Sequence, residues 1–149
     1  MNKKKKIMLL ITAGIICAAV LLAALAAAGK LTGDQKVSFV KVPDTKIPVD
    51  IEEDVIPEYK TLERALACCV DDDIYVIVTR GEKPTSGYGV SIAKVTLEKE
   101  DDKTNLIVYA DFKDPEEETP ISQIITYPMD IVKTDLKQLP DTIQMRIQY

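Results

Sequence analysis

From residue 74 onward the chain is a succession of short β-like runs separated by polar turns. The runs are rich in Val, Ile, Tyr and Thr and mostly follow the two-residue period of a strand. We expect strands at 74–79, 90–97, 106–112, 121–127 and 142–147, with 130–133 continuing the fourth as an edge. The apolar phase switches near Ala93-Lys94, which predicts a β-bulge or a strong bend. Residues 37–42 predict one more strand, at an edge.

A single amphipathic helix is expected over residues 57–69. Pro57 suits the first helical position, and the Glu58 carboxylate suits the first turn of a helix dipole. Apolar side chains then recur at helical spacing, at Tyr59, Leu62, Leu66 and Cys69. The acidic run 71–73 reads as a solvated turn. The predicted fold is therefore mainly β (α+β), and either a sandwich or a single antiparallel sheet backed by the helix fits the pattern.

The N-terminus predicts a membrane segment. Lys3–Lys6 precede an uncharged apolar run at 7–28, which spans about 33 Å as a helix and so exceeds the ~30 Å hydrocarbon core. Lysines before the run predict an inside N-terminus and an exported remainder. We expect an uncleaved, single-pass anchor in the cell membrane. The alternatives are cleavage near Ala28, which would release a secreted domain, and lipidation at Cys17, although Ile16 is too bulky for a lipobox.

Charge and length then divide the chain. The predicted parts are a basic cytoplasmic tail (1–6), an anchor or signal (7–28), a linker and edge segment (29–56) and one folded domain (57–149). Residues 30–149 hold 15 basic and 24 acidic side chains, a net charge of −9. Such an acidic domain is poorly suited to polyanions, so we expect no nucleic-acid partner.

The residue types argue against an enzyme. Histidine is absent, which removes Ser-His and Cys-His pairs and histidine-based metal sites. Pro84 prevents a helical Ser-Lys dyad between Ser86 and Lys83. Adjacent Cys68 and Cys69 cannot chelate a metal alone, so we expect small buried side chains, with a vicinal disulfide as the alternative. We expect no cofactor and no metal.

The best candidate for a functional site is the loop between the first two predicted strands of the domain. Its candidate partner-binding residues are Arg80, Lys83, Pro84, Thr85, Ser86, Gly87 and Tyr88. Pro84 restricts the backbone, while Gly87 permits a positive φ and close approach of a partner. Tyr88 is either a plug returning to the core or an aromatic anchor. Most such loops are ordinary connections.

Two segments carry a family resemblance. Gly-Glu-Lys-Pro-Thr-Ser-Gly-Tyr at 81–88 resembles the Gly-x-x-Pro-Thr-Gly-Gly-Tyr loop of the PrcB C-terminal domain, with Ser86 departing at one position. Residues 123–132 resemble a second segment of that family. The likeness covers roughly residues 57–133. It implies a non-catalytic, extracytoplasmic protein that supports or binds a protease.

A more distant resemblance connects the same loop with chagasin-like cysteine-protease inhibitors. Residues 84–88 match part of their Asn-Pro-Thr-Thr-Gly-Tyr loop, with Lys83 in place of the Asn. Those inhibitors also use an aromatic residue on another loop, and this chain has no Trp. The expected function is therefore that of an accessory or assembly subunit of a surface protease complex. Protease inhibition and an envelope-structural role are the alternatives.

Overall fold

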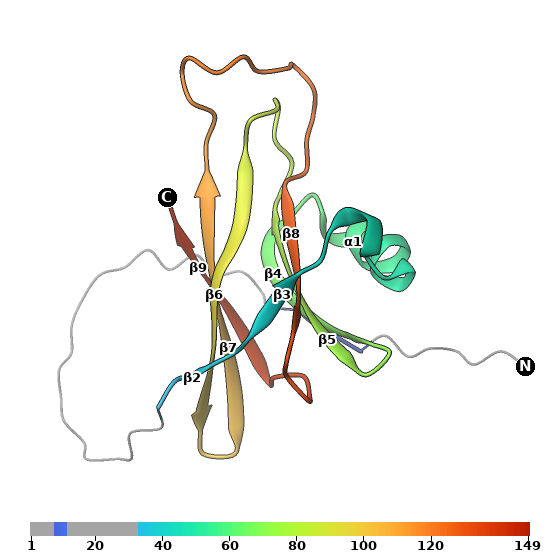
Figure 1. Cartoon of the computed structure of the whole chain (residues 1–149), viewed down its shortest axis with the longest axis vertical. Helices are drawn as coiled ribbons and strands as arrows, with labels where there is room; N and C mark the ends of the chain where they lie inside the picture. Colours follow the sequence, from blue (N-terminus) through green and yellow to red (C-terminus); the bar gives the residue numbers. More distant parts are fainter. Residues whose placement is uncertain (1–7, 12–32) are drawn as a thin grey trace, which may run out of the picture.

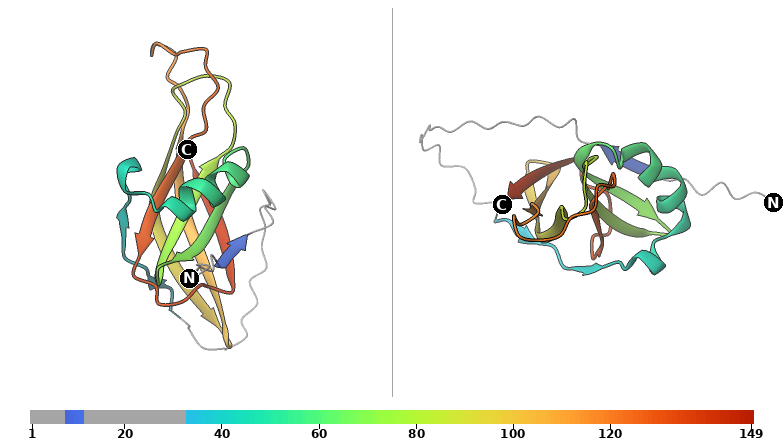
Figure 2. Two further views of the ribbon diagram at one scale, coloured as in Figure 1. Left: turned by 90° about the vertical axis from the view of Figure 1, so that its right-hand side faces the viewer. Right: turned by 90° about the horizontal axis from the view of Figure 1, so that it is seen from above.

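Two β-sheets packed face to face form the body of the molecule (Figures 1 and 2). The computed structural model describes residues 8–11 and 33–149. The five-stranded sheet has the order β1-β4-β5-β8-β3, and the four-stranded sheet has the order β2-β6-β7-β9. The strands are β1 (Met8–Ile11), β2 (Gln35–Lys36), β3 (Phe39–Lys41), β4 (Glu63–Val70), β5 (Asp73–Arg80), β6 (Gly89–Glu100), β7 (Lys103–Lys113), β8 (Met129–Thr134) and β9 (Thr142–Gln148).

The main core lies between the sheets. Alternate side chains of the facing strands are buried there, because successive residues of a strand point to opposite faces. The core includes Ala65, Val76, Val78 and Val132 from one sheet, and Val95, Leu106, Val108 and Phe112 from the other. The sequence prediction of a mainly β fold is confirmed.

A helical layer covers the other face of the five-stranded sheet (Figure 2, right). After the 3-10 turn η1 (Asp44–Lys46), the chain forms a π-helical turn, η2 (Ile51–Val55), and then the α-helix α1 (Ile56–Tyr59). Ile51, Val55 and Tyr59 are buried at a spacing of four residues, against Leu66, Cys68 and Ile77 of the sheet. The molecule is thus both a sandwich and a helix-backed sheet. Burial raises the pKa of Tyr59.

The predicted helix at 57–69 is wrong over most of its length. Only its first residues are helical, and residues 63–70 form β4, which pairs with β5 from Glu63↔Arg80 to Val70↔Asp73. The helical spacing misled because Leu66 and Cys68 face the helical layer while Ala65 and Ala67 face the sandwich core. A strand buried on both faces carries no polar face to reveal its period.

A two-residue turn at Asp71-Asp72 explains how β4 reverses into β5. Both residues have positive φ, 51° and 68°, as a type I′ hairpin turn requires, and Asp adopts this conformation more readily than most residues. The acidic run is therefore a hairpin turn, and it follows a strand instead of a helix.

Some of the predicted strands are confirmed and others are wrong. β5, β6 and β7 confirm the runs at 74–79, 90–97 and 106–112, and the register of β6 shifts between Ile92 and Lys94, where the bulge was predicted. Residues 121–127 do not form the predicted strand. β8 is an inner strand between β5 and β3 rather than an edge, and β9 is parallel to β7 rather than antiparallel.

The first described residues belong to the sheet. Met8–Ile11 pair antiparallel with β4, from Met8↔Cys69 to Ile11↔Leu66. The rest of the predicted membrane segment, residue 7 and residues 12–28, lies outside the described residues. No helix in the described ranges combines the length and the apolar character needed to cross a bilayer.

Candidate partner-binding site

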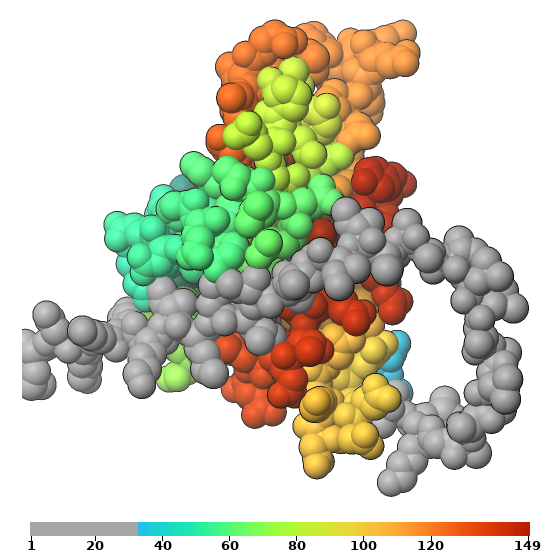
Figure 3. All heavy atoms as spheres, turned by 180° about the vertical axis from the view of Figure 1, so that it is seen from behind, coloured from blue at the N-terminus to red at the C-terminus, as the bar shows by residue number. Residues whose placement is uncertain are grey.

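Two loops project together from one end of the sandwich (Figures 1 and 3). Loop 81–88 connects β5 to β6, and loop 114–128 connects β7 to β8. β6 begins and β7 ends at the same edge, where Gly89 pairs with Lys113, so both loops leave the sheets side by side. We call residues 81–88 and 114–128 the loop pair.

Hydrogen bonds hold the two loops together. Lys83 and Thr126 exchange two backbone bonds of 2.9 Å, and the Thr126 hydroxyl donates to the Thr85 carbonyl at 2.8 Å. Farther out, the Ser86 N–H donates to the Ser122 carbonyl at 3.0 Å, and the Ser122 N–H donates to the Ser86 hydroxyl at 2.8 Å. These bonds make the loop pair one two-stranded arm rather than two separate connections.

Gly87 allows the loops to approach closely. Its φ is +95°, and a Cβ built there would lie 3.0 Å from Pro115 Cβ and 3.4 Å from Ile121 Cγ2. A side chain at this position would be strained by the backbone and crowded by the neighbouring loop. The requirement for glycine comes from packing within the arm.

Arg80 stabilises the base of the arm, where the loops leave β6 and β7. Its side chain is 4% exposed, and it donates hydrogen bonds to the carbonyls of Gly89 (3.2 Å) and Lys113 (2.5 Å) and forms an ion pair with Asp114. Its guanidinium carbon lies 5.1 Å from the Tyr88 ring centre. Arg80 thus joins the end of β5 to the first residues of β6 and the last of β7, and its charge is directed inward.

Tyr88 lies beside this buried arginine and is half-buried. The Lys83 ammonium also lies near the Tyr88 ring, 5.6 Å from its centre. Two cations therefore approach the same aromatic ring. The Tyr88 ring therefore packs onto the domain and keeps part of its surface exposed to solvent. Lys83, Thr85 and Ser86 are half-buried, while Pro84 and Gly87 are exposed.

A second tyrosine fixes the inner end of the arm. The Tyr127 hydroxyl donates to a Glu82 carboxylate oxygen at 3.0 Å, and the Lys60 ammonium lies 4.7 Å from the Tyr127 ring centre. The hydrogen bond to Glu82 raises the pKa of Tyr127. The contact connects both loops of the pair to the segment that follows α1.

Three isoleucines on loop 114–128 are exposed to solvent. Ile121, Ile124 and Ile125 have exposed fractions of 42%, 58% and 60%. Next to them runs the exposed acidic segment 116–118. These three residues were not among the predicted site residues, because residues 121–127 were assigned to a strand. Pro120 and Pro128, which bracket the segment, were the available signal of a loop.

A comparison with known families identifies this region. The PrcB C-terminal family model matches residues 74–135. No curated protein and no solved structure matches the chain. The resemblance predicted from residues 81–88 and 123–132 is confirmed, and it begins at β5 rather than at the helical segment.

The PrcB C-terminal match contains the whole loop pair and the strands that carry it. It also contains Asp130, which lies within the second resembling segment and is 8% exposed. One Asp130 carboxylate oxygen accepts the Ile92 N–H at 2.7 Å, at the bulge in β6, and the other lies 3.6 Å from the Lys41 ammonium. Asp130 therefore bonds the backbone of the opposite sheet where the bulge breaks the ladder.

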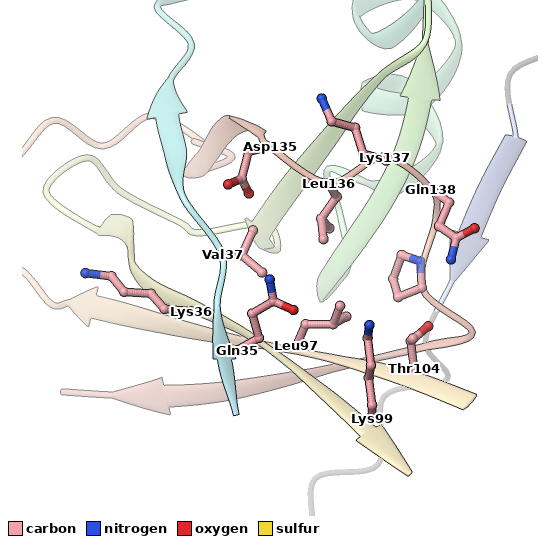
Figure 4. A pocket seen from close by; sticks show the side chains of 11 residues that line it. Gln35, Lys36, Val37, Leu97, Lys99, Thr104, Asp135, Leu136, Lys137 and Gln138 are labelled. Atoms are coloured by element: carbon pink, nitrogen blue, oxygen red, sulfur yellow. The ribbon is translucent and has the colours of Figure 1, made fainter. Parts of the chain in front are cut away.

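A hollow of about 250 Å³ lies at the other end of the β6–β7 hairpin, away from the loop pair (Figure 4). Val37, Leu97 and Leu136 provide apolar walls, and Lys99 and Asp135 contribute opposite charges. Asp135 already accepts the Ser38 N–H at 3.1 Å. The arrangement holds no nucleophile–base pair. Within the described residues, no three His, Cys, Asp or Glu side chains are grouped to bind a metal ion.

Proposed function

We propose that this chain is a non-catalytic, membrane-anchored binding subunit that supports a protease complex outside the cell membrane, with the loop pair as its binding surface. The PrcB C-terminal match supports an accessory role in a protease complex. The observation that carries the choice of surface is the exposed isoleucine group, Ile121, Ile124 and Ile125, on an arm braced by hydrogen bonds.

The energetics favour contact through these isoleucines. Full burial of an isoleucine side chain is worth roughly 1.5–3 kcal/mol, so covering three that are about half exposed contributes a few kcal/mol. Because the arm is already ordered by its internal bonds, binding loses less conformational entropy than it would with two mobile loops. A partner with an apolar cleft would fit this arm.

The residues predicted from sequence then take different roles. Pro84 and Gly87 are exposed, and Lys83 and Tyr88 retain partial exposure, so these four can contact a partner. Thr85 and Ser86 hold the arm together through loop 114–128. Arg80 is a positioning residue, since its side chain is buried and bonded to the sandwich.

Membrane attachment is proposed from the N-terminal sequence. The apolar run 7–28 with lysines on its N-terminal side favours a single-pass anchor and an exported domain. Cleavage near Ala28 would give a secreted domain with the same loop pair.

The experiment is affinity capture from cell envelopes with the full-length chain in detergent, followed by a turnover assay. The Ile124→Ser/Ile125→Ser variant removes exposed apolar surface from the loop pair. Val40→Ser/Val49→Ser is the matched control, because those valines are 72% and 55% exposed elsewhere. We expect wild type and the valine control to capture a protease and the isoleucine variant to lose it.

The turnover assay separates the functions. An accessory subunit leaves the captured protease's turnover unchanged or raises it, whereas a chagasin-like inhibitor blocks turnover at a one-to-one ratio. Equal capture by all three proteins would place binding outside the loop pair and contradict the proposal. Capture of no protease would favour the envelope-structural alternative.

A further inference from the structure

The outer edge of β4 carries a second inference, independent of the loop pair. β4 is hydrogen-bonded to β5 on one side over its whole length, without a register shift. On its other side, within the described residues, the short strand β1 pairs with residues 66–69. Leu66, Ala67 and Cys68 are fully buried.

This edge has none of the usual protection against pairing with other chains. Exposed edge strands are commonly defended by charged side chains, proline or a bulge. Residues 65–70 have the sequence Ala-Leu-Ala-Cys-Cys-Val, with no charge and no proline. The only charged residues of β4, Glu63 and Arg64, lie at its start. An edge of this composition needs a covering strand.

Strand β1 cannot cover the edge in a chain that crosses the membrane once. β1 ends at Ile11 and β2 begins at Gln35, and both strands belong to the same sandwich. A single crossing by residues 7–28 would put residue 11 inside the bilayer and residue 35 on its outer side. Moreover, only residues 12–28 of the apolar run would remain for the crossing, which is about 26 Å of helix against a ~30 Å core.

The anchor and the cleavage near Ala28 would therefore both uncover β4. Insertion as an anchor moves Met8–Ile11 into the bilayer, and cleavage near Ala28 removes them. We propose that, in the exported protein, the edge of β4 at residues 66–69 accepts an extended, uncharged apolar segment of a partner protein as an antiparallel strand.

The class of partner follows from the strand that occupies the edge in the structure. β1 has the sequence Met-Leu-Leu-Ile and pairs antiparallel, Leu9 with Cys68 and Leu10 with Ala67. In such strand addition, backbone hydrogen bonds supply the affinity and alternate side chains supply the specificity. A segment of at least four apolar residues, free to extend, meets these requirements.

The test uses the full-length chain in lipid nanodiscs and a synthetic peptide with the sequence of residues 6–12. Amide hydrogen exchange is followed at those alternate residues of 66–69 whose N–H groups point away from β5. We expect fast exchange in the nanodisc alone and at least tenfold slower exchange at saturating peptide.

Two N-methylated peptides provide matched controls. One carries N-methyl groups at the positions of Met8 and Leu10, and the other at those of Leu9 and Ile11. Only alternate residues of an antiparallel pair direct their N–H groups toward the neighbouring strand. We therefore expect one methylated peptide to lose binding and the other to bind within about threefold of the parent. Both peptides have the same apolar content, so nonspecific partitioning into lipid would affect them equally.

Three results would overturn the proposal. The first is slow exchange of the outward-pointing amides of residues 66–69 in the nanodisc before peptide is added, since the edge would then be covered already. The second is no slowing when peptide is added. The third is equal binding by both methylated peptides, which would indicate apolar contact without strand pairing.

Discussion

At the residue scale, two buried charged side chains join the sheets. Arg80 reaches from β5 to the carbonyls of Gly89 and Lys113, and Asp130 reaches from β8 to the Ile92 N–H. Each side chain hydrogen-bonds backbone groups of the opposite sheet. Both lie within the segment matched by the PrcB C-terminal model, so this match includes structural residues as well as exposed ones.

Arg80→Met should destabilise the domain by about 2–4 kcal/mol, because it leaves two backbone carbonyls at the base of the arm without their donor. Urea unfolding measures the change. Arg146→Met is the control, because Arg146 is exposed and donates a hydrogen bond to the Tyr109 hydroxyl, a side-chain group. A loss below about 0.5 kcal/mol for Arg80→Met would contradict the assigned role.

The adjacent cysteines should differ in reactivity. Both are free; Cys68 is fully buried and Cys69 is half-buried. Burial raises the pKa of Cys68 to about 12, so its reactive thiolate is scarce at pH 8. In a Cys17→Ala background, a chain keeping only Cys69 should react with iodoacetamide at least tenfold faster than one keeping only Cys68. Equal rates, measured by mass spectrometry, would count against the burial of Cys68.

The sequence identified the candidate loop but not the directions of its side chains. The loop at 81–88 was found because its Pro and Gly residues punctuate two strong β runs. The inward direction of Arg80 was not predictable, since the carbonyls it bonds are brought near only by the pairing of β6 with β7. The exposure of Ile124 and Ile125 was likewise hidden, because apolar residues near Thr and Tyr read as a strand.

At the element scale, the local residue pattern predicted the hairpin strands correctly. It failed for strands whose structure depends on packing against residues far away in the sequence. β5, β6, the bulge and β7 follow from alternation and turn residues. β4 was taken for a helix because both its faces are buried by elements from elsewhere in the chain. The parallel pairing of β9 with β7 depends on where the 135–141 connection crosses, and no local residue pattern encodes that.

The arm depends on Gly87. Gly87→Val places a β-branched side chain at φ +95° and against Pro115, so it should separate loop 81–88 from loop 114–128. Amide exchange at Ser86 and Ser122 should become at least tenfold faster. Gly33→Val is the control, because a Cβ there meets no atom within 4 Å. Unchanged exchange at both serines would show that the loops are not held together as described.

The hydrogen bonds of Asp141, the residue before β9, should stabilise the fold less at acid pH. Asp141 accepts hydrogen bonds from the Thr104 N–H (2.7 Å) and hydroxyl (2.9 Å), and these bonds lower the pKa of its carboxyl group. A carboxylate with a lowered folded-state pKa stabilises the fold above its unfolded pKa of about 4 and loses this effect as the pH falls through the folded value.

Asp141→Asn should therefore destabilise the domain at pH 7, and the difference from wild type should shrink as the pH falls from about 4 toward 2. Unfolding midpoints across this range measure it. Asp44→Asn, which removes another exposed carboxylate, controls for net charge. A difference that grows in acid would reverse the assigned sign.

At the scale of the whole molecule, the sandwich separates its two proposed contact regions. The loop pair extends from one end, and the β4 edge runs along the side of the five-stranded sheet (Figures 1 and 2). Because the loop pair is built from the β5–β6 and β7–β8 connections, pairing at β4 leaves it unobstructed. The two regions can therefore be tested one at a time.

The central claim is that the exposed isoleucines of the loop pair contact a partner protein. Site-specific photo-crosslinking in the intact source cell tests it most directly, with benzoylphenylalanine placed at Ile125 or, as the control, at Val40, which is 72% exposed. We predict a discrete higher-mass adduct containing a protease subunit from position 125 and none from position 40. Absence of an adduct at position 125, or the same adduct at both positions, would contradict the account.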